Sequence, residues 1–252
     1  MRTIFAAAVA ALLSVALPAA AAEVDVELVL AADGSGSIDD DELAFQRRGY
    51  AEAVLSPEVL NAIAAGVTGA IAIAYVEWGG PTSQHTIVDW TVVRDRASAE
   101  DFAHALVDRP RAAYGYNSIS AAIDYAASKI ETNEHRGLRR VIDVSGDGPN
   151  IGGRPVTEAR DDAVARGIVI NALVVQRPGG MVRAPGGVPL SVHYERDMIG
   201  GPAAFVMIAD DRLSFADAVR RKMILEIAGL PATGESDHVS THRVPRADPS
   251  TE

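Results

Sequence analysis

The stretch "VLAADGSGSID", residues 29–39, decides the fold. It begins as a continuous apolar run, which is typical of a strand buried on both faces of a sheet. The run ends abruptly in Asp33, followed by two glycines and two serines. The sequence therefore predicts a buried strand that delivers a loop of small, oxygen-bearing side chains to the edge of a sheet.

Strand and helix patterns alternate along the chain. Strands are predicted at residues 24–33, 69–79, 84–93, 139–148, 168–175 and 203–209. Helices are predicted at residues 39–56, 98–108, 117–130, 155–167 and 214–229, with a short helix near 194–201. This alternation indicates an α/β fold with a doubly wound, mainly parallel sheet and helices on both faces. Only a short Gly-Pro turn joins 69–79 to 84–93, so these two strands are predicted to form a hairpin.

Three finer expectations follow from the helix and loop patterns. Ser98 is the expected cap of the helix at 98–108. Residues Arg220, Arg221 and Lys222 are interpreted as the solvated face of the closing helix. The Gly- and Pro-rich segment 176–193 is interpreted as a long loop at the carboxyl edge of the sheet. That loop either contributes to a partner-binding surface, with Arg177 and Arg183 as attractants for an acidic partner, or is an insertion without a role.

A second polar cluster, "SGDG" at residues 145–148, ends another predicted strand and contains Asp147. Right-handed crossovers bring the carboxyl ends of parallel strands to one edge, where ligands of open α/β sheets bind. The clusters around Asp33 and Asp147 are therefore expected to meet in space although they lie far apart in the sequence.

The first cluster has the chemistry of a site for a hard cation. Asp33, Ser35 and Ser37 alternate along the loop, so their oxygens can converge on one point, and Gly34 and Gly36 permit a tight turn. Such oxygens suit Mg²⁺, Mn²⁺ or Ca²⁺. The same residues also make a good turn in which a polar side chain caps the next helix. From the residues alone, both interpretations remain open.

Common catalytic and nucleotide-binding motifs do not fit these clusters. Asp39 stands where the last glycine of G-x-G-x-x-G belongs, and there is no phosphate loop of the form G-x-x-x-x-G-K-[ST]. Ser35 has glycines directly beside it, so it does not match G-x-S-x-G. No histidine lies beside either cluster in the sequence, although a triad assembled from distant residues stays open.

Composition and the chain start bound the setting. Residues 1–22 carry one positive charge, an apolar stretch and an Ala-rich end, which is the pattern of a secretory signal peptide. An uncleaved anchor is the alternative. We expect one domain at 23–230, a polar and disordered tail at 231–252, and no stable membrane insertion once the signal is cleaved. The chain has no cysteine, and its formal charge of −11 argues against nucleic-acid binding.

The two polar clusters resemble motifs of a known family. "DGSGSI" after a buried strand resembles the Asp-x-Ser-x-Ser signature of von Willebrand factor type A (VWA) domains, and "SGDGPN" resembles their later strand-ending Asp-Gly. The likeness covers most of residues 24–229. The export signal and the stretch "YERDMIGGPAAFV" are similar to an exported bacterial group of such domains whose function is open.

The resemblance implies a six-stranded sheet with an antiparallel edge strand and a metal-ion-dependent adhesion site (MIDAS) at its upper edge. Ser35 and Ser37 would coordinate the ion directly, and Asp33 and Asp147 would act more often through water. The family usually adds a threonine, and Asn117 stands at that position here, with Ser118 as a possible substitute. The metal set implied by the resemblance is thus Asp33, Ser35, Ser37, Asn117 and Asp147, with Mg²⁺ expected and Mn²⁺ or Ca²⁺ as alternatives.

For function, the resemblance implies binding rather than catalysis. Two hydroxyl ligands leave the cation with charge and a coordination position to spare, which the carboxylate of a protein or peptide partner can fill. The expected setting is periplasmic or secreted. Two alternatives remain open: a metal-assisted hydrolase that uses the same site, and a scaffold whose metal site is vestigial.

Overall fold

The computed structural model describes residues 22–176, 183–210 and 214–229. The expected signal peptide, except Ala22, and the expected tail at 231–252 lie outside these residues. Among the residues described, no helix is both long and apolar enough to cross a membrane.

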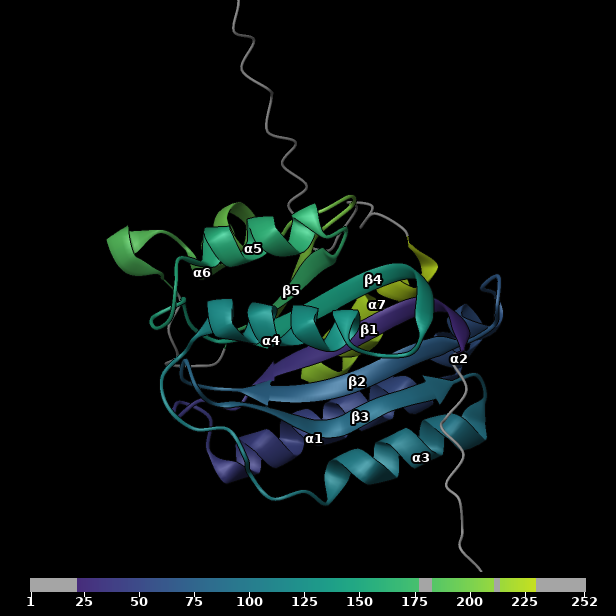
Figure 1. Cartoon of the computed structure of the whole chain (residues 1–252). Coiled ribbons are helices and arrows are strands. Elements are labelled where there is room, and N and C mark those ends of the chain that lie inside the picture. The colour runs from purple at the N-terminus through teal and green to yellow at the C-terminus, as the bar shows by residue number, and fades with distance from the viewer. Residues whose placement is uncertain (1–21, 177–182, 211–213, 230–252) are drawn as a thin grey trace, which may run out of the picture.

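Six strands form one sheet in the order β3-β2-β1-β4-β5-β6 (Figure 1). They span Glu23–Asp33 (β1), Ile71–Trp78 (β2), Gln84–Val93 (β3), Arg136–Gly146 (β4), Val169–Val175 (β5) and Val206–Ala209 (β6). All neighbouring pairs are parallel except β2 and β3, which form an antiparallel hairpin at the edge. The predicted doubly wound sheet with one antiparallel edge strand is confirmed.

Helices cover both faces of the sheet (Figure 1). On one face the core takes side chains from α1 (Asp40–Leu55), α2 (Pro57–Ala64), α3 (Arg96–Val107) and α7 (Phe215–Ala228). On the other it takes them from α4 (Ile119–Glu131), α5 (Val156–Ala165), α6 (Leu190–His193) and the adjoining turn Tyr194–Met198. The molecule is therefore a three-layer sandwich.

The position of β1 in the centre of the sheet explains why residues 28–32 are continuously apolar. Val26, Leu28 and Leu30 point into the core beneath α1 and α7, whereas Val29 and Ala31 point into the core beneath α4 and α5. Successive side chains of a strand face opposite sides, so a strand buried on both faces is apolar at every position. Burial of β1 fixes where its last residue, Asp33, emerges.

The presence of α2 and the start of α3 differ from the helices expected. Helix α2 was not predicted, although Ser56 caps it and Pro57 occupies its first turn, a combination that marks helix starts. Helix α3 begins at Arg96 and is capped by Asp95, so the expected cap role of Ser98 is wrong. Ser98 instead completes a reciprocal capping pair with Asp95 from inside the first turn.

Segment 176–193 is not a plain loop. It contains the short helical turns Pro185–Gly187 and Leu190–His193, because prolines at 185 and 189 favour helix starts. Within it, Arg183 donates to the carbonyl of Gly187 at 2.5 Å. Arg177 lies outside the described residues.

The interpretation of Lys222 as a solvated residue is wrong. Its side chain is fully buried between α7 and the sheet, 2.7 Å from the carboxylate of Asp143 and 2.5 Å from that of Glu226. Asn171 donates to the same Glu226 oxygen at 2.9 Å. The stem packs in the core while two carboxylates neutralise the ammonium, so a charged residue tolerates this position.

Candidate metal-binding site

The loop after β1 is shaped by Asp33. The backbone N–H of Ser35 donates to Asp33 Oδ1 at 2.8 Å, which closes a tight local turn. The N–H of Gly34 donates to the carbonyl of Trp78 at the end of β2, also at 2.8 Å. On the other side, the amide of Gln46 from α1 donates to the carbonyl of Asp33 at 2.9 Å. Strand, neighbouring strand and helix together hold the loop.

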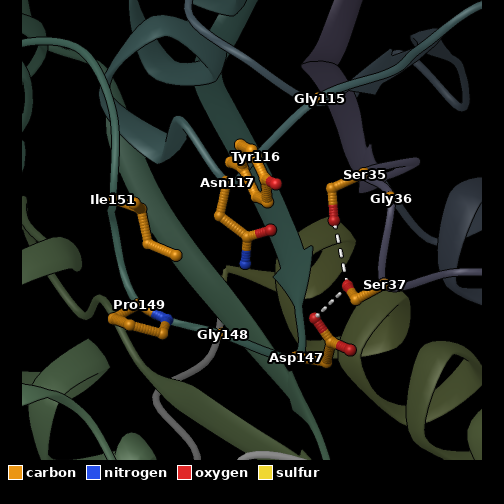
Figure 2. A pocket seen from close by; sticks show the side chains of 10 residues that line it. All are labelled: Ser35, Gly36, Ser37, Gly115, Tyr116, Asn117, Asp147, Gly148, Pro149 and Ile151. Atoms are coloured by element: carbon orange, nitrogen blue, oxygen red, sulfur yellow. Dashed lines mark hydrogen bonds between the residues drawn. The ribbon is translucent and has the colours of Figure 1, made fainter.

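The two polar clusters meet at the carboxyl edge of the sheet. Ser35 Oγ lies 3.0 Å from Ser37 Oγ, and Ser37 Oγ donates to Asp147 Oδ1 at 3.2 Å (Figure 2). Asp147 follows β4, which is the direct neighbour of β1. The structure thus brings together Asp33, Ser35, Ser37 and Asp147 from two strand ends that are far apart in the chain.

One carboxylate oxygen of Asp33 has no hydrogen-bond donor among the described residues. Its Oδ2 atom is buried and accepts no hydrogen bond within the part of the chain that the structure describes. Burial, reinforced by the nearby Asp147 carboxylate, raises the pKa of Asp33 to about 7, although the Ser35 N–H acts in the opposite direction. An orphaned buried carboxylate oxygen beside a second carboxylate is unfavourable without a counter-charge. A cation, or failing that a proton, would relieve it.

Asn117 lies just before α4 and lines the same pocket. Its backbone carbonyl accepts from the N–H groups of Ile151 and Gly152 at 2.8 and 3.0 Å, which fixes the residue against the second loop. A Cβ on Gly148 would lie 2.4 Å from Asn117 Nδ2, so the glycine makes room for the amide. The residue at the position of the family threonine therefore does face the site.

Ser118 does not take over from Asn117. Its hydroxyl is buried and donates to the carbonyl of Gly152 at 2.9 Å, and Ser120 Oγ shares that acceptor at 3.4 Å. Neither serine lines the pocket. Because Ser118 Oγ already has a buried partner, turning it toward the cluster would leave the Gly152 carbonyl with a poorer donor.

The pocket has a volume of about 700 Å³ and opens to solvent. Among the described residues, no three His, Cys, Asp or Glu side chains gather as metal ligands. The oxygens here come from two carboxylates, two hydroxyls and one amide. Such oxygen ligands, three of them neutral, suit a hard cation rather than a soft one. The residues present therefore fit the ion that the resemblance implies. No histidine of the described ranges lines the pocket.

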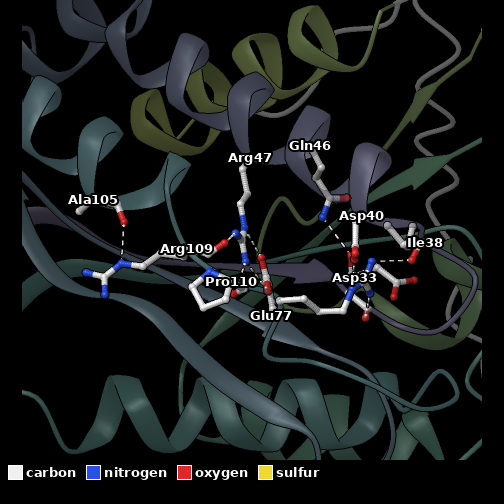
Figure 3. A network of polar contacts seen from close by, with 11 residues as sticks. Asp33, Ile38, Asp40, Gln46, Arg47, Glu77, Ala105, Arg109 and Pro110 are labelled. Carbon is white, nitrogen blue, oxygen red and sulfur yellow. Dashed lines mark hydrogen bonds and ion pairs between the residues drawn. The ribbon is translucent and has the colours of Figure 1, made fainter.

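A buried ion pair that no sequence pattern predicted lies beside Asp33 (Figure 3). Arg47 of α1 pairs with Glu77 of β2 through two contacts of 2.7 and 2.9 Å, and both side chains are almost wholly buried. The same guanidinium donates to the carbonyls of Arg109 and Pro110. It therefore anchors the start of the loop that leads to Asn117.

Arg111 links that loop to the first motif. It donates to the carbonyls of Gly34 and Ile38 at 3.0 and 2.7 Å and pairs with Asp40 at 2.7 Å. Neither arginine belongs to a recognisable motif, since each acts on backbone atoms of segments far away in the sequence. In the sequence, Arg47 and Arg111 are isolated arginines, so no local pattern identifies them as part of the site.

The sheet order and the helices on its two faces are those of a von Willebrand factor type A-like domain. A family model described as "Protein of unknown function (DUF1194)" matches residues 23–231, and the chain belongs to that family. No curated protein sequence matches the chain.

Solved structures with the same fold are distant in sequence. Proximal thread matrix protein 1 from the mussel byssus, with a zinc-occupied MIDAS motif, is 16% identical with a TM-score of 0.57, over 83% of this chain and 49% of that one. The pilus adhesin SpaC from Lactobacillus rhamnosus GG is 13% identical with a TM-score of 0.56, over 84% and 30%. A von Willebrand factor type A protein from Catenulispora acidiphila is 13% identical with a TM-score of 0.51, over 83% and 42%.

The chain thus spans about half the length of the byssus protein and less of the other two. At these identities the likeness establishes the fold, including the VWA-like topology, and nothing finer.

Proposed function

We propose that this domain captures a protein or peptide partner through a divalent cation at the edge of the sheet. The observation that carries the proposal is the buried, unsatisfied Asp33 Oδ2 beside the paired hydroxyls of Ser35 and Ser37 and the Asp147 carboxylate. In this proposal the ion is held by Asp33, Ser35, Ser37, Asn117 and Asp147. The bound ion supplies an electrophilic centre for an incoming carboxylate.

The residues have separate tasks in this proposal. The two serine hydroxyls offer neutral oxygens, so they hold the cation without cancelling its charge. Asp33, fixed by the Ser35 N–H, contributes negative charge from below the loop. Asn117 offers an amide oxygen from across the pocket. A cation held mainly by neutral ligands keeps affinity for a partner's carboxylate, which is why we favour capture over turnover.

The comparisons support this proposal by analogy. One protein of the same fold carries zinc in its MIDAS motif, and another is a pilus adhesin. For this chain we propose Mg²⁺ as the ion, with Mn²⁺ or Ca²⁺ as substitutes. The proposed setting is the periplasm or the cell exterior, after removal of residues 1–22 as a signal peptide.

Calorimetric titration of Mg²⁺ and Mn²⁺ into the chelator-treated protein tests the metal step. Wild type should bind one ion, whereas Asp33→Ala and Ser35→Ala should lose at least about tenfold in affinity. Asp101→Ala, an exposed acid on α3, is the matched control and should bind as wild type does. Equal binding by all four proteins would remove the proposed site.

Capture is tested separately. Proteins retained by the immobilised wild-type domain in Mg²⁺ should be released by EDTA and should not be retained by the Ser35→Ala domain. Retention that ignores both changes would show that the ion has no part in capture. Metal binding without any retained partner would favour a scaffold with an idle site.

A further inference from the structure

Exposed apolar side chains cluster on the two loops that flank the pocket. Tyr116 is 80% exposed and Tyr114 is 61% exposed on the loop before α4, and Ile151 is 61% exposed on the loop after β4. Tyr116 and Ile151 line the pocket together with Pro149. In the view of Figure 2, Ile151 and Pro149 lie on one side of the pocket, and Ser35 and Ser37 lie on the other. We call Tyr114, Tyr116 and Ile151 the apolar rim.

The backbone beneath the apolar rim is firmly held. The N–H of Gly36 donates to the carbonyl of Gly115 at 2.9 Å, and that of Gly80 donates to the carbonyl of Tyr114 at 2.8 Å. Gly115 has φ +97°, and a Cβ there would lie 3.1 Å from the nitrogen of Gly80. The glycine thus lets two loops approach closely. The tyrosines project from a fixed frame, so ordering them against a ligand costs little conformational entropy.

The same backbone joins the apolar rim to the metal ligands. Gly36, whose N–H is hydrogen-bonded to the carbonyl of Gly115, stands between Ser35 and Ser37. Asn117 follows Tyr116 directly. The N–H of Ile151 donates to the carbonyl of Asn117 at 2.8 Å. Three backbone connections therefore join the apolar rim to the proposed metal ligands: Gly36 to Gly115, Tyr116 to Asn117, and Ile151 to Asn117. A ligand group on the ion would lie beside the apolar rim.

The pocket is also larger than a metal ion and one carboxylate require. About 700 Å³ accommodates several side chains of a ligand, and most of its wall beyond the metal set is apolar or glycine. Small soluble domains usually bury aromatic side chains, and a cluster of exposed ones beside a polar site is typical of a recognition surface.

From this arrangement we propose that the partner's acidic residue is flanked by apolar side chains that seat on Tyr114, Tyr116 and Ile151. This inference rests on the proposed function, since the acid is the group that meets the cation. The apolar rim then selects among acidic segments: a solvated acidic run gains only the ion contact, whereas an acid next to Phe, Leu or Ile also buries apolar area. The free energy from burying apolar side chains adds to that of the contact between carboxylate and ion, because the two interactions use different atoms of the peptide.

The test uses three blocked peptides in Mg²⁺, titrated into the ¹⁵N-labelled domain and followed by NMR. Their cores are Gly-Phe-Asp-Phe-Gly, Gly-Gly-Asp-Gly-Gly and Gly-Phe-Asn-Phe-Gly. We expect the first to bind about tenfold more tightly than the second, as burial of apolar side chains of this size allows. The third should bind no better than the second, because it has no carboxylate. Amide shifts should concentrate at residues 113–118 and 147–152.

Variants separate this inference from the proposed function. The double variant Tyr116→Ala with Ile151→Ala should bind Mg²⁺ as wild type does but lose the preference for Phe-flanked acid. Leu138→Ala is the matched control, since Leu138 is 66% exposed near the start of β4, at the opposite edge of the sheet. It should keep the preference.

Each other outcome is decisive. Equal binding of the Phe- and Gly-flanked acids, or Mg²⁺ binding without binding of any peptide, would overturn the apolar rim as a selector. Equal binding of the two Phe-flanked peptides, with Asn and with Asp, would overturn the link between the apolar rim and the cation. Absence of Mg²⁺ binding would remove the proposed function itself, and this inference with it.

Discussion

At the scale of single residues, the environment of Asp33 lowers the stability of the metal-free protein when its carboxylate is charged. Its backbone neighbours position the carboxylate, yet one oxygen is buried without a donor among the residues that the structure describes, and a second carboxylate lies nearby. Such an arrangement stores a cost at the site that a bound cation would remove. The same burial that makes the residue unfavourable alone makes it a good ligand.

The Asp33 pKa gives the sign of a pH effect. In the metal-free protein the pKa is raised from 3.8 to about 7, so the folded state holds a proton that the unfolded state loses. Stability should therefore fall as pH rises from about 4 to 7. In EDTA, Asp33→Asn should be more stable than wild type at pH 8 by about 1–3 kcal/mol, with a smaller gain at pH 5.

Urea unfolding at the two pH values measures this difference. Saturating Mg²⁺ should reverse the order at pH 8, because only wild type gains the binding free energy of the ion. A stability difference that ignores both pH and Mg²⁺ would contradict the described state of Asp33.

Gly148 tests the contribution of Asn117 without removing the amide. An added Cβ would lie 2.4 Å from Asn117 Nδ2, so Gly148→Ala should push the amide from its place and weaken Mg²⁺ binding by about tenfold. Gly36→Ala is the matched control in the same pocket, because its Cβ meets nothing closer than 3.7 Å. If calorimetry gives both variants the same affinity as wild type, Asn117 is not a ligand.

At the scale of elements, two arginines place one loop of the site relative to another. Arg47 reaches from α1 to the segment after α3 and binds its carbonyl groups (Figure 3). Arg111 links the same segment to the carbonyls of Gly34 and Ile38. A long connection between α3 and α4 therefore behaves as a fixed part of the site, since its carbonyls and side chains have partners at several points.

Removing the Arg111 contacts should loosen the site more than the fold. We expect Arg111→Ala to bind Mg²⁺ about tenfold more weakly, because the loops that carry Asn117 and Ser35 lose a shared anchor. The change in unfolding free energy should stay within about 1–2 kcal/mol. Arg109→Ala, an exposed neighbour, is the control for calorimetry, and an unchanged affinity in Arg111→Ala would contradict the anchoring role.

The buried Lys222 holds α7 against the sheet. Lys222→Met leaves Asp143 and Glu226 facing each other without a counter-charge, and should destabilise the domain by about 3–5 kcal/mol in chemical unfolding. Arg48→Met changes an exposed position on the neighbouring helix α1 and should shift stability by no more than about 0.5 kcal/mol. Similar losses in the two variants would mean that the buried ion cluster does not stabilise the helix packing.

At the scale of the whole molecule, the sandwich explains why local patterns were informative. Burial on both faces makes residues 28–32 of β1 uniformly apolar, and parallel winding brings Asp33 and Asp147 to one edge whatever lies between them. These two facts were enough to predict the sheet and the convergence of the two polar loops.

The sequence was uninformative where partners come from distant segments. Lys222 looks like part of a solvated basic run, and only the packing of α7 against the sheet, with the ion pair to Asp143, shows that it is buried. Arg47 and Arg111 act on carbonyls, which carry no sequence signal. Helix α2 was missed for a different reason: its Ser-Pro start directly follows the end of α1, so one helix was predicted up to residue 56 and no element was assigned to the residues after it.

Crystals of the domain grown with Mn²⁺ and measured for anomalous scattering would locate the proposed ion. We predict one strong peak within about 2.3 Å of the hydroxyl oxygens of Ser35 and Ser37, on the side that faces Asn117. A map with no peak between Asp33, Ser37 and Asp147 at saturating Mn²⁺ would contradict the cation on which capture is proposed to depend.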